Sequence, residues 1–224
     1  MGFSRGPSIV TDGLVLALDA ANTKSYPGSG TTWTDLSGNG TTGTLTNGPT
    51  FDSGNQGSID FDGTNDYALL GNSSQFNLTN KISVLAWVNA ESNTGWNGIF
   101  GTISGGTFIH FQTYNGGPNA YVYGPNAGYS NLDSTTVTQG QWNQLGFTFY
   151  NSTLTMYVNG ASLETTVTTN SNNITSTTTA GIGRVFSGDR YMNGKIAGVS
   201  IYNVGLSSEQ ILQNYNATKS RFGL

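Results

Sequence analysis

The amino-acid sequence predicts an all-β protein, a two-sheet antiparallel sandwich that ends in one short helix. About half of the 224 residues are Gly, Thr, Asn or Ser, and charged residues make up only 9% of the chain, against roughly 25% in an average soluble domain. Thr and aromatic residues favour strands and Gly and Asn favour turns, whereas Glu and Lys, which fill helices at little cost, are scarce here. Short apolar runs separated by turn residues recur at about 8–14 residues, the spacing of a sandwich.

The predicted strands follow one another along the chain, each bounded by Gly, Asn, Ser or Asp. They are residues 13–20, 58–62, 67–70, 81–90, 98–103, 107–113, 120–123, 142–150, 153–158, 162–169, 180–186 and 195–202. In 81–90, Val84 and Ala86 face one way and Leu85 and Trp87 the other, so both faces look partly buried. The stretch from 23 to about 55 has few apolar residues and is expected to be a surface loop, a segment type that often carries function.

Residues 142–150 and 153–158 form the best-defined predicted hairpin. The Asn159-Gly160 dipeptide that follows is typical of a type I′ turn, because both central residues of that turn need a positive φ. Trp142 begins the hairpin strand, in which Leu145, Phe147 and Phe149 alternate with polar neighbours. We therefore expect Trp142 to be buried.

One helix is predicted near the C-terminus. Ser207-Ser208-Glu209-Gln210 has the Ser-x-x-Gln pattern of a capping box, in which the first and last side chains satisfy each other's backbone N–H groups. Ile211, Leu212 and Tyr215 follow at helical spacing. The helix is expected to close the domain.

Composition excludes several classes of function. The net charge of −4 and pI of about 4.6 offer no electrostatic footprint for nucleic acid or anionic membranes. No apolar run approaches the roughly 18 residues that cross a bilayer, and the N-terminus lacks the apolar stretch of a secretory signal. The absence of Cys removes disulfides and thiol chemistry, and with His110 as the single histidine a multi-histidine zinc site within one chain is excluded.

Four motifs, in order along the chain, carry a resemblance to a known family. They are Trp33-Thr34-Asp35-Leu36-Ser37-Gly38-Asn39-Gly40; Phe61-Asp62-Gly63-Thr64-Asn65-Asp66-Tyr67; Gln141-Trp142-Asn143 with Met156-Tyr157-Val158-Asn159-Gly160; and Ile201-Tyr202-Asn203 with Leu206-Ser207. From Gly13 to about Tyr215 the chain resembles a concanavalin A-like (laminin G-like) jelly roll. The resemblance implies the fold but not one function, since lectins, hydrolases, adhesion modules and virion proteins share it.

The two ends carry a narrower resemblance, to structural proteins of tailed phages. It is seen in Ile9-Val10-Thr11-Asp12-Gly13-Leu14 through Asp19-Ala20-Ala21-Asn22 and Ser25-Tyr26-Pro27-Gly28, and in Gln213-Asn214-Tyr215-Asn216-Ala217-Thr218 with Arg221-Phe222-Gly223-Leu224. This resemblance implies a capsid decoration (cement), head-fibre or tail-associated subunit, assembled in the host cytoplasm and located in the virion. Its partners would be capsid or tail proteins, further copies of the chain in a homo-oligomer (a trimer is favoured) and host surface glycans.

The chain is expected to divide into an N-terminal arm (1–12), a jelly-roll domain (13–217) and a C-terminal tail (218–224). Phe222 and Leu224 are apolar, and Lys219 and Arg221 are cationic. From this mixture we expect the tail to dock against a neighbouring subunit.

No catalytic constellation is apparent, and we expect a protein that is not an enzyme. Glycosidases of this fold place carboxylates close together on one strand, whereas Glu91, Glu164 and Glu209 are scattered. Asp60 and Asp62 share one strand face, but a solvated strand edge explains them better than an acid/base pair does. His110 is interpreted as a core or sheet-face histidine rather than a general base.

No metal ligand is assigned, although calcium remains a candidate cofactor. Calcium prefers carboxylate, carbonyl and amide oxygens, and the loops Asp35-Leu36-Ser37-Gly38-Asn39 and Asn65-Asp66 are rich in them. Related calcium-binding jelly rolls resemble this chain but usually add a carboxylate just before the Ile-Tyr-Asn of the final strand, where this chain has Ala197-Gly198-Val199-Ser200. The alternative is that these Asp and Asn side chains form Asx turns.

Aromatic residues in a Gly-, Asn- and Pro-rich region are the candidate carbohydrate-binding site. Trp96, Tyr114, Tyr121 and Tyr129 are the predicted contacts, with Tyr123 in the same region. The alternative is that these rings simply pack within their strands. A carbohydrate-binding module of a bacterial surface or secreted protein, dependent on calcium, is therefore the alternative to the virion role.

Overall fold

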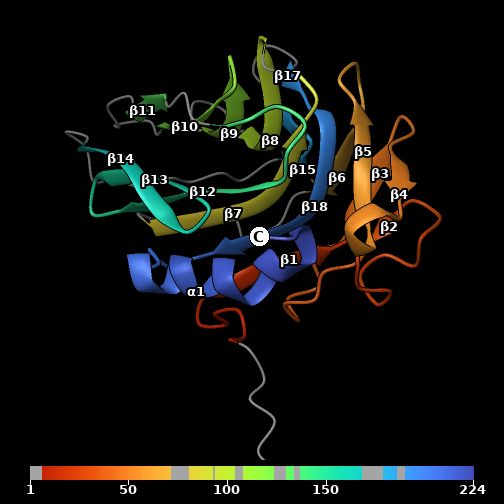
Figure 1. Cartoon of the computed structure of the whole chain (residues 1–224), viewed down its shortest axis with the longest axis horizontal. Helices are drawn as coiled ribbons and strands as arrows, with labels where there is room; N and C mark the ends of the chain where they lie inside the picture. Colours follow the sequence, from red (N-terminus) through yellow and green to blue (C-terminus); the bar gives the residue numbers. More distant parts are fainter. Residues whose placement is uncertain are drawn as a thin grey trace, which may run out of the picture.

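The computed structural model describes residues 7–71, 81–92, 94–103, 108–123, 130–133, 137–167, 179–185 and 190–224. Two large antiparallel sheets stack face to face, and one helix lies along the side of one sheet that faces away from the other (Figure 1). The all-β sandwich with one short C-terminal helix, predicted from composition and spacing, is confirmed.

Sheet A has eight strands in the order β14-β13-β12-β7-β18-β5-β4, with β1 paired to β18 beside β5. Their bounds are β1 (Leu14–Asp19), β4 (Thr50–Asp52), β5 (Ser58–Asp62), β7 (Lys81–Ala90), β12 (Asn143–Tyr150), β13 (Thr153–Val158), β14 (Ala161–Val167) and β18 (Asn193–Tyr202). The central pair β7 and β18 is antiparallel, like every other pair in the sheet.

Sheet B also has eight strands, in the order β11-β10-β9-β8-β15-β6-β3-β2. Their bounds are β2 (Thr32–Trp33), β3 (Gly43–Thr46), β6 (Tyr67–Gly71), β8 (Trp96–Ile103), β9 (Phe108–Tyr114), β10 (Gly117–Tyr123), β11 (Ser130–Asp133) and β15 (Thr179–Ile182). A separate two-stranded hairpin, β16 (Arg184–Val185) with β17 (Arg190–Tyr191), follows β15.

The core lies between the two sheets and is filled by alternate residues of both. Val84 and Ala86 of β7 and Phe147 of β12 point into it from sheet A, and Phe111 of β9 points into it from sheet B. The rings of Phe111 and Phe147 meet across the gap, with centroids 5.3 Å apart in an edge-to-face arrangement. The alternation that predicted these strands therefore also assigns their inner faces.

Several short elements differ from prediction. The stretch 23–55 is not only a loop, because it contributes β2, β3 and β4 to the edges of the two sheets together with the 3₁₀ turn η1 (Gly54–Gln56). Such two- to four-residue strands are too short to show an alternating pattern. The predicted strand 180–186 is interrupted at Gly183, whose φ of +78° breaks the extended chain between β15 and β16.

The predicted turn at Asn159-Gly160 and the predicted helix are confirmed. Asn159 and Gly160 both have positive φ values, 52° and 80°, as a type I′ turn requires. Helix α1 (Ser208–Thr218) begins with the predicted capping box, in which the Ser207 side chain accepts from the Gln210 N–H and the Gln210 side chain accepts from the Ser207 N–H. In the part of the chain that the structure describes, no helix is long and apolar enough to cross a membrane.

Helix α1 packs on the outer face of sheet A, the face that points away from sheet B. Ile211 of α1, Tyr202 of β18, Leu85 of β7 and Val10 of the N-terminal arm form a second apolar cluster there. Asn214 of α1 accepts a hydrogen bond from the Val10 N–H at 2.8 Å. The N-terminal arm and the helix are thus joined over this face.

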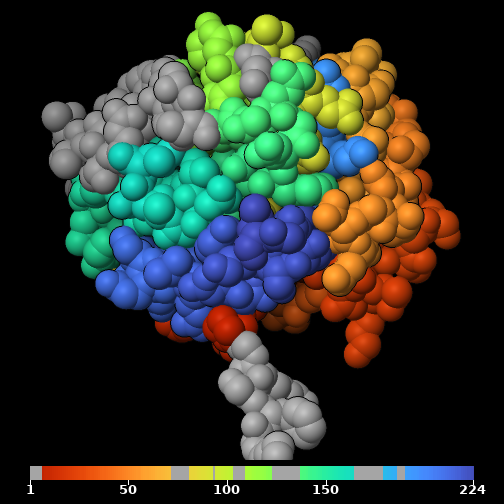
Figure 2. All heavy atoms as spheres, viewed as in Figure 1, coloured from red at the N-terminus to blue at the C-terminus, as the bar shows by residue number. Residues whose placement is uncertain are grey.

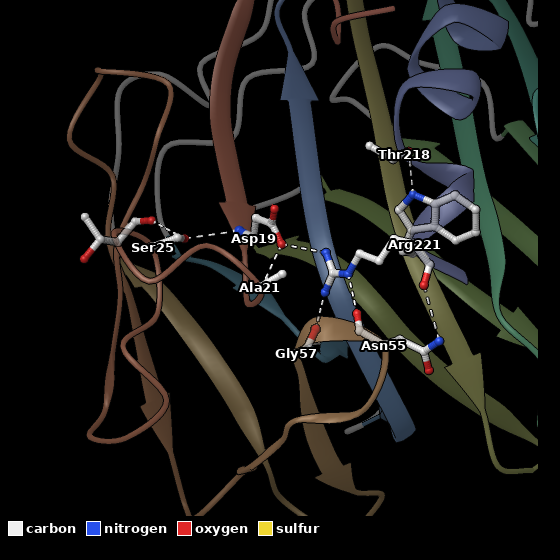
Figure 3. A network of polar contacts seen from close by, with 9 residues as sticks. Asp19, Ala21, Ser25, Asn55, Gly57, Thr218 and Arg221 are labelled. Atoms are coloured by element: carbon white, nitrogen blue, oxygen red, sulfur yellow. Dashed lines mark hydrogen bonds and ion pairs between the residues drawn. The ribbon is translucent and has the colours of Figure 1, made fainter. Parts of the chain in front are cut away.

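The C-terminal tail continues as the 3₁₀ helix η3 (Lys219–Phe222) and lies on its own chain. In Figure 2 the blue C-terminal segment lies on the surface beside the orange segment, to which η1 belongs. Phe222 stacks on Trp87 with ring centroids 4.1 Å apart, and Arg221 donates to Asp19 at 2.7 Å and to the backbone carbonyls of Asn55 and Gly57 (Figure 3). Two of the four residues from which docking on a neighbouring subunit was predicted, Arg221 and Phe222, are therefore engaged within the chain, whereas Leu224 is 50% exposed.

The expected burial of Trp142 is wrong. Trp142 precedes β12 and is only half-buried, against Phe222 at 4.9 Å between ring centroids, while its Nε1 donates to Asn55 Oδ1 at 3.0 Å. The reason is parity. Leu145, Phe147 and Phe149 point into the core, so an even-numbered residue of the same strand run points to the outer face.

Candidate functional site

The outer face of sheet B, which points away from sheet A, carries the predicted aromatic residues. Strands β8, β9 and β10 are neighbours, and their register pairs Trp96 with Tyr114 and pairs His110 with Tyr121. Paired residues point to the same side of a sheet. Because Phe111 and Ala120, each adjacent in sequence to a member of the pair His110 and Tyr121, are in the core, the first set lies on the outer face.

A three-layer stack forms one end of this face. The rings of Trp96 and Tyr114 are 3.9 Å apart at 24°, and the Arg190 guanidinium carbon is 3.7 Å from the centre of the Trp96 ring. Two groups that are both within 4 Å of one ring centre cannot share one side of the ring, so Trp96 lies between them. Tyr114, which is 38% exposed, is then the member of the stack whose other side is open.

Amide side chains continue from the stack along the face. Arg190 Nη1 donates to Gln112 Oε1 at 3.1 Å, and Gln112 Nε2 donates to Asn119 Oδ1 at 2.7 Å. Gln112 and Asn119 are fully buried, so these bonds fix both amides. The chain of bonds orients Arg190, and Arg190 in turn holds the stacked rings.

The hairpin β16–β17 can approach β8 closely because β8 has glycine at positions 98 and 101. A Cβ on Gly98 would stand 2.4 Å from the Arg190 carbonyl oxygen, and one on Gly101 would stand 2.7 Å from Val185 Cα. Glycine within a strand often marks such a close backbone approach. These glycines bring Arg190 of β17 over the sheet.

His110 is a buried sheet-face residue, as predicted. It is 4% exposed, and its ring lies edge-on to that of Tyr121, with centroids 6.3 Å apart. Burial, aided by the positive charge of Arg190, lowers the pKa of the imidazole to about 4. His110 is therefore neutral at physiological pH.

The structure brings together two of the four predicted sugar contacts. Trp96 and Tyr114 stack, but Tyr121 lies further along the face and is only 9% exposed, so it offers no open ring. Tyr129 and the side chain of Tyr123 lie outside the described residues. Sequence reasoning missed Arg190, Gln112 and Asn119, although the glycines of β8 were a signal that another segment crosses this strand.

The two loops considered for calcium use their carboxylates as structural acceptors. Asp35 is 9% exposed. Its Oδ1 accepts from the N–H groups of Ala17 and Ser37 at 2.9 and 2.8 Å, and its Oδ2 accepts from Ser37 Oγ at 2.7 Å. In the second loop, Asp66 Oδ2 accepts from the Asp62 N–H at 3.2 Å. Of these, the bond from the Ser37 N–H to Asp35 Oδ1 has the two-residue spacing of the Asx turn of the alternative interpretation.

Asp60 and Asp62 lie on the outer face of β5, beside a polar pocket of about 410 Å³ that Asp66 and Glu91 also line. Asp60 is 3.9 Å from Lys195 Nζ, and Lys195 is itself bonded to Asp52 at 2.5 Å. Asp62 Oδ1 accepts from the N–H groups of Thr64 and Asn65. The Asp60 carboxylate is thus a salt-bridge partner of Lys195, and the Asp62 carboxylate accepts the hydrogen bonds of the turn that follows β5. Among the described residues, no group of three or more acidic or histidine side chains is arranged to hold a metal ion.

The fold is similar to that of several solved structures. Domain 4 of AbnA, a GH43 extracellular arabinanase from Geobacillus stearothermophilus solved with arabinotriose, has 19% identity and a TM-score of 0.71 over 90% of this chain and 98% of that domain. The receptor-binding domain of botulinum neurotoxin D has 15% identity and a TM-score of 0.73 over 92% of this chain and 52% of that chain. A mutant of Trypanosoma rangeli sialidase displaying trans-sialidase activity has 16% identity and a TM-score of 0.70. That match covers 98% of this chain and 35% of the sialidase chain.

This chain thus spans about half of the neurotoxin domain and about a third of the sialidase. At these identities the likeness concerns the fold alone. No curated protein matches the sequence. A family model described as the concanavalin A-like lectin/glucanases superfamily matches residues 62–212, about two thirds of the chain. The chain belongs to the concanavalin A-like lectin/glucanases superfamily, with the lectin-like jelly roll that its four ordered motifs predicted.

Proposed function

We propose that this chain is a non-enzymatic binding domain that holds a glycan at the Tyr114 end of the outer face of sheet B. The observation that carries the proposal is the stack Arg190–Trp96–Tyr114, which leaves one side of an exposed tyrosine ring open. Apolar faces of sugars pack on aromatic rings, and nearby amide and guanidinium groups supply directional hydrogen bonds. The buried bonds of Gln112 and Asn119 keep the stack rigid, which lowers the entropic cost of binding.

A glycan array tests this proposal. Tyr114→Ala should abolish binding of any glycan that the intact protein retains, with little change in melting temperature, because Tyr114 is a surface residue. Tyr150→Ala is the matched control, since Tyr150 is 45% exposed on sheet A. Loss of binding in both variants, or in neither, would contradict a site at Tyr114.

We propose further that the domain is a structural protein of a tailed-phage virion, as a capsid decoration, head-fibre or tail-associated subunit. The support is the resemblance of both chain ends to such proteins, together with how those ends are used. Val10 and Gln213 connect the N-terminal arm to α1, and Arg221 connects η3 to the turn at Asn55. Oligomers of identical subunits are commonly closed and symmetric, and we favour a trimer.

Mass spectrometry of purified virions tests the virion role. The chain should be present in stoichiometric amounts beside capsid or tail proteins, and light scattering of the isolated protein should give the mass of an oligomer. Virions without the chain would refute the role without affecting the glycan proposal.

A second candidate is the carbohydrate-binding module of a bacterial surface or secreted protein. The likeness to domain 4 of AbnA favours it, since that domain matches over 98% of its length and was solved with an arabinan oligosaccharide. Arabinotriose binding by this chain, lost in Tyr114→Ala and dependent on calcium, would favour the module. Binding to intact host cells without affinity for arabinan would favour the virion role.

A further inference from the structure

The hairpin β16–β17 brings two arginines to aromatic rings of sheet B. Arg190 lies over the Trp96 ring, and Arg184 lies over the rings of Tyr67 and Tyr191, with its guanidinium carbon 5.2 and 5.0 Å from their centres. Figure 1 shows β17 beside β8, the strand that carries Trp96. The hairpin therefore adds positive charge to the region of the proposed glycan site.

The strands beneath Arg190 do not balance its charge. The sequences of β8, β9 and β10 contain no Asp or Glu. His110 of β9 is neutral at physiological pH, because burial, and then the charge of Arg190, lower the pKa of its imidazole to about 4. Among the residues that the structure describes, no carboxylate forms an ion pair with Arg190. Arg190 is thus a cation that still lacks a counter-charge.

One edge of the Arg190 guanidinium is used and another is open. Nη1 donates to Gln112 Oε1 at 3.1 Å. Nε and Nη2 donate to no acceptor in the described part of the chain, and neither is buried without a partner, so both reach solvent. These two nitrogens carry parallel N–H groups, which match the two oxygens of a carboxylate. Arg190 therefore presents an open fork for a carboxylate.

Arg221 shows how this chain uses an arginine that serves the fold alone. Its Nη1 donates to Asp19 at 2.7 Å, and its Nε and Nη2 donate to the carbonyls of Asn55 and Gly57. All three nitrogens are bonded, and the charge is paired with a carboxylate. Arg190 has a ring and one neutral amide instead, which hold the guanidinium in place without neutralising it.

The stack also limits the size of the ligand. Arg190 and Tyr114 lie on opposite sides of the Trp96 ring. A sugar on the open side of Tyr114 is therefore three layers in van der Waals contact away from Arg190, roughly 11 Å. One sugar ring does not span this distance. A ligand that contacts both residues has at least two sugars and passes along the edge of Trp96.

We propose that the glycan held on this face is acidic: an oligosaccharide with one sugar packed on Tyr114 and another whose carboxylate accepts from Nε and Nη2 of Arg190. This inference rests on the proposed glycan function and narrows it to one class of ligand. The net charge of −4 does not oppose it, because charges further apart than about 8 Å are largely screened at physiological ionic strength. The two arginines of the hairpin set the local charge.

An array of acidic and neutral oligosaccharides tests the proposal on the intact protein, and we expect every retained glycan to carry a carboxylate. Calorimetry then compares each retained glycan with its own methyl ester, which keeps the sugar chain and removes the charge. Sialyllactose and trigalacturonate, each with its ester, are the first pairs. The acid should bind at least tenfold more tightly than the ester, and added NaCl should weaken binding of the acid only.

Two variants of Arg190 separate recognition of the carboxylate from support of the stack. Arg190→Gln should abolish the preference for acid over ester, whatever it does to the affinity for the ester. Arg190→Lys keeps the charge but not the fork and should keep only part of the preference. Lys24→Gln is the matched control, since it removes one positive charge from an exposed turn after β1 and should leave the preference unchanged. Circular dichroism checks that each variant is folded.

Retention of neutral glycans only, equal affinity for acid and ester, or an unchanged preference in Arg190→Gln would overturn the acidic ligand. If Tyr114→Ala still abolishes binding in those cases, the glycan function stands without it. A sulfated lactose that binds as tightly as the carboxylates would overturn the carboxylate as the recognised group. An array that retains no glycan would overturn both this inference and the glycan function.

Discussion

The outer faces of the two sheets follow the same alternation but are completed in different ways. On sheet A the outward residues Leu85, Tyr157 and Tyr202 are apolar or aromatic, and the N-terminal arm and α1 cover them. On sheet B the outward residues Gln112 and Asn119 are polar, and they bond to one another and to Arg190. In one face, burial of apolar area stabilises the fold. In the other, a bonded polar network holds an exposed ring in place.

Trp87 on sheet A and Trp96 on sheet B each lie in an aromatic stack on the outer face, which makes the comparison measurable. Trp87 on sheet A is 6% exposed, stacks on Phe222 and donates from Nε1 to Thr218 Oγ1 at 2.9 Å. Trp96 on sheet B is half-buried and stacks on Tyr114 and Arg190. The first is enclosed by the chain's own end, and the second stands beside the proposed ligand.

The largest effect is expected from Trp87→Ala. Removing a buried tryptophan and the contacts of η3 should lower the free energy of unfolding by about 3–5 kcal/mol. Trp96→Ala should lower it by only about 1 kcal/mol, because Trp96 is half-buried and its ring stacks on the exposed residue Tyr114. Chemical denaturation of both variants measures the difference, and equal losses would show that the two faces are alike in energy.

A smaller effect on stability is expected from pH, through His110. Because burial lowers its pKa from 6.5 to about 4, the unfolded chain binds a proton between these pH values that the folded protein does not. Stability is therefore full above pH 6.5 and is lost as the pH falls towards 4, by about 3 kcal/mol from this group.

His110→Gln should remove that part of the pH dependence. Burial raises the pKa of the Asp60 and Asp66 carboxyls, so these two groups make the protein more stable as the pH falls, opposite to His110. The difference in stability between His110→Gln and the parent at each pH therefore isolates the contribution of the imidazole. As His110 is the only histidine, one NMR resonance reports its titration, and a midpoint near 6.5 would refute a buried neutral imidazole.

Deletion of residues 219–224 should cost about 2 kcal/mol of stability, from the lost Phe222 stack and the bonds of Arg221. The sandwich should stay folded, since β18 and α1 precede the cut. Trp87 then becomes exposed, and its fluorescence should shift to longer wavelength. A deletion that leaves stability unchanged but lowers the mass seen by light scattering to that of the monomer would restore the tail to a role between subunits.

Features set by nearby residues could be predicted from the sequence. The hairpin turn at Asn159-Gly160 and the capping box at Ser207 each depend on residues within four positions of one another. The inner faces of β7 and β12 follow from alternation alone. The same rule places Trp142 outward, so the error there came from treating an aromatic residue as core regardless of its parity.

Features that join distant segments could not be predicted in this way. Phe222 stacks on Trp87, Arg190 reaches Gln112, and Asn214 meets Val10. Each contact depends on which strands become neighbours, and no local pattern encodes that order. Trp96 and Tyr114 were selected as exposed aromatics, but their stacking with Arg190 follows from the register of β8 with β9 and from the glycines that admit the hairpin β16–β17.

The smallest effect is expected from removal of metal ions. Asp35 already accepts three hydrogen bonds, two of them from backbone N–H groups, so the chain itself provides the positive partial charges that a calcium ion would supply. EDTA should therefore change the melting temperature by less than about 1 °C. By contrast, Asp35→Ala should destabilise the protein by about 1–3 kcal/mol whether or not calcium is present, because it leaves the buried N–H of Ala17 without a partner. A melting temperature that falls in EDTA and recovers with calcium, and that no longer responds to either in Asp35→Ala, would show that the carboxylate is a metal ligand in solution and that the hydrogen bonds described here give way to it.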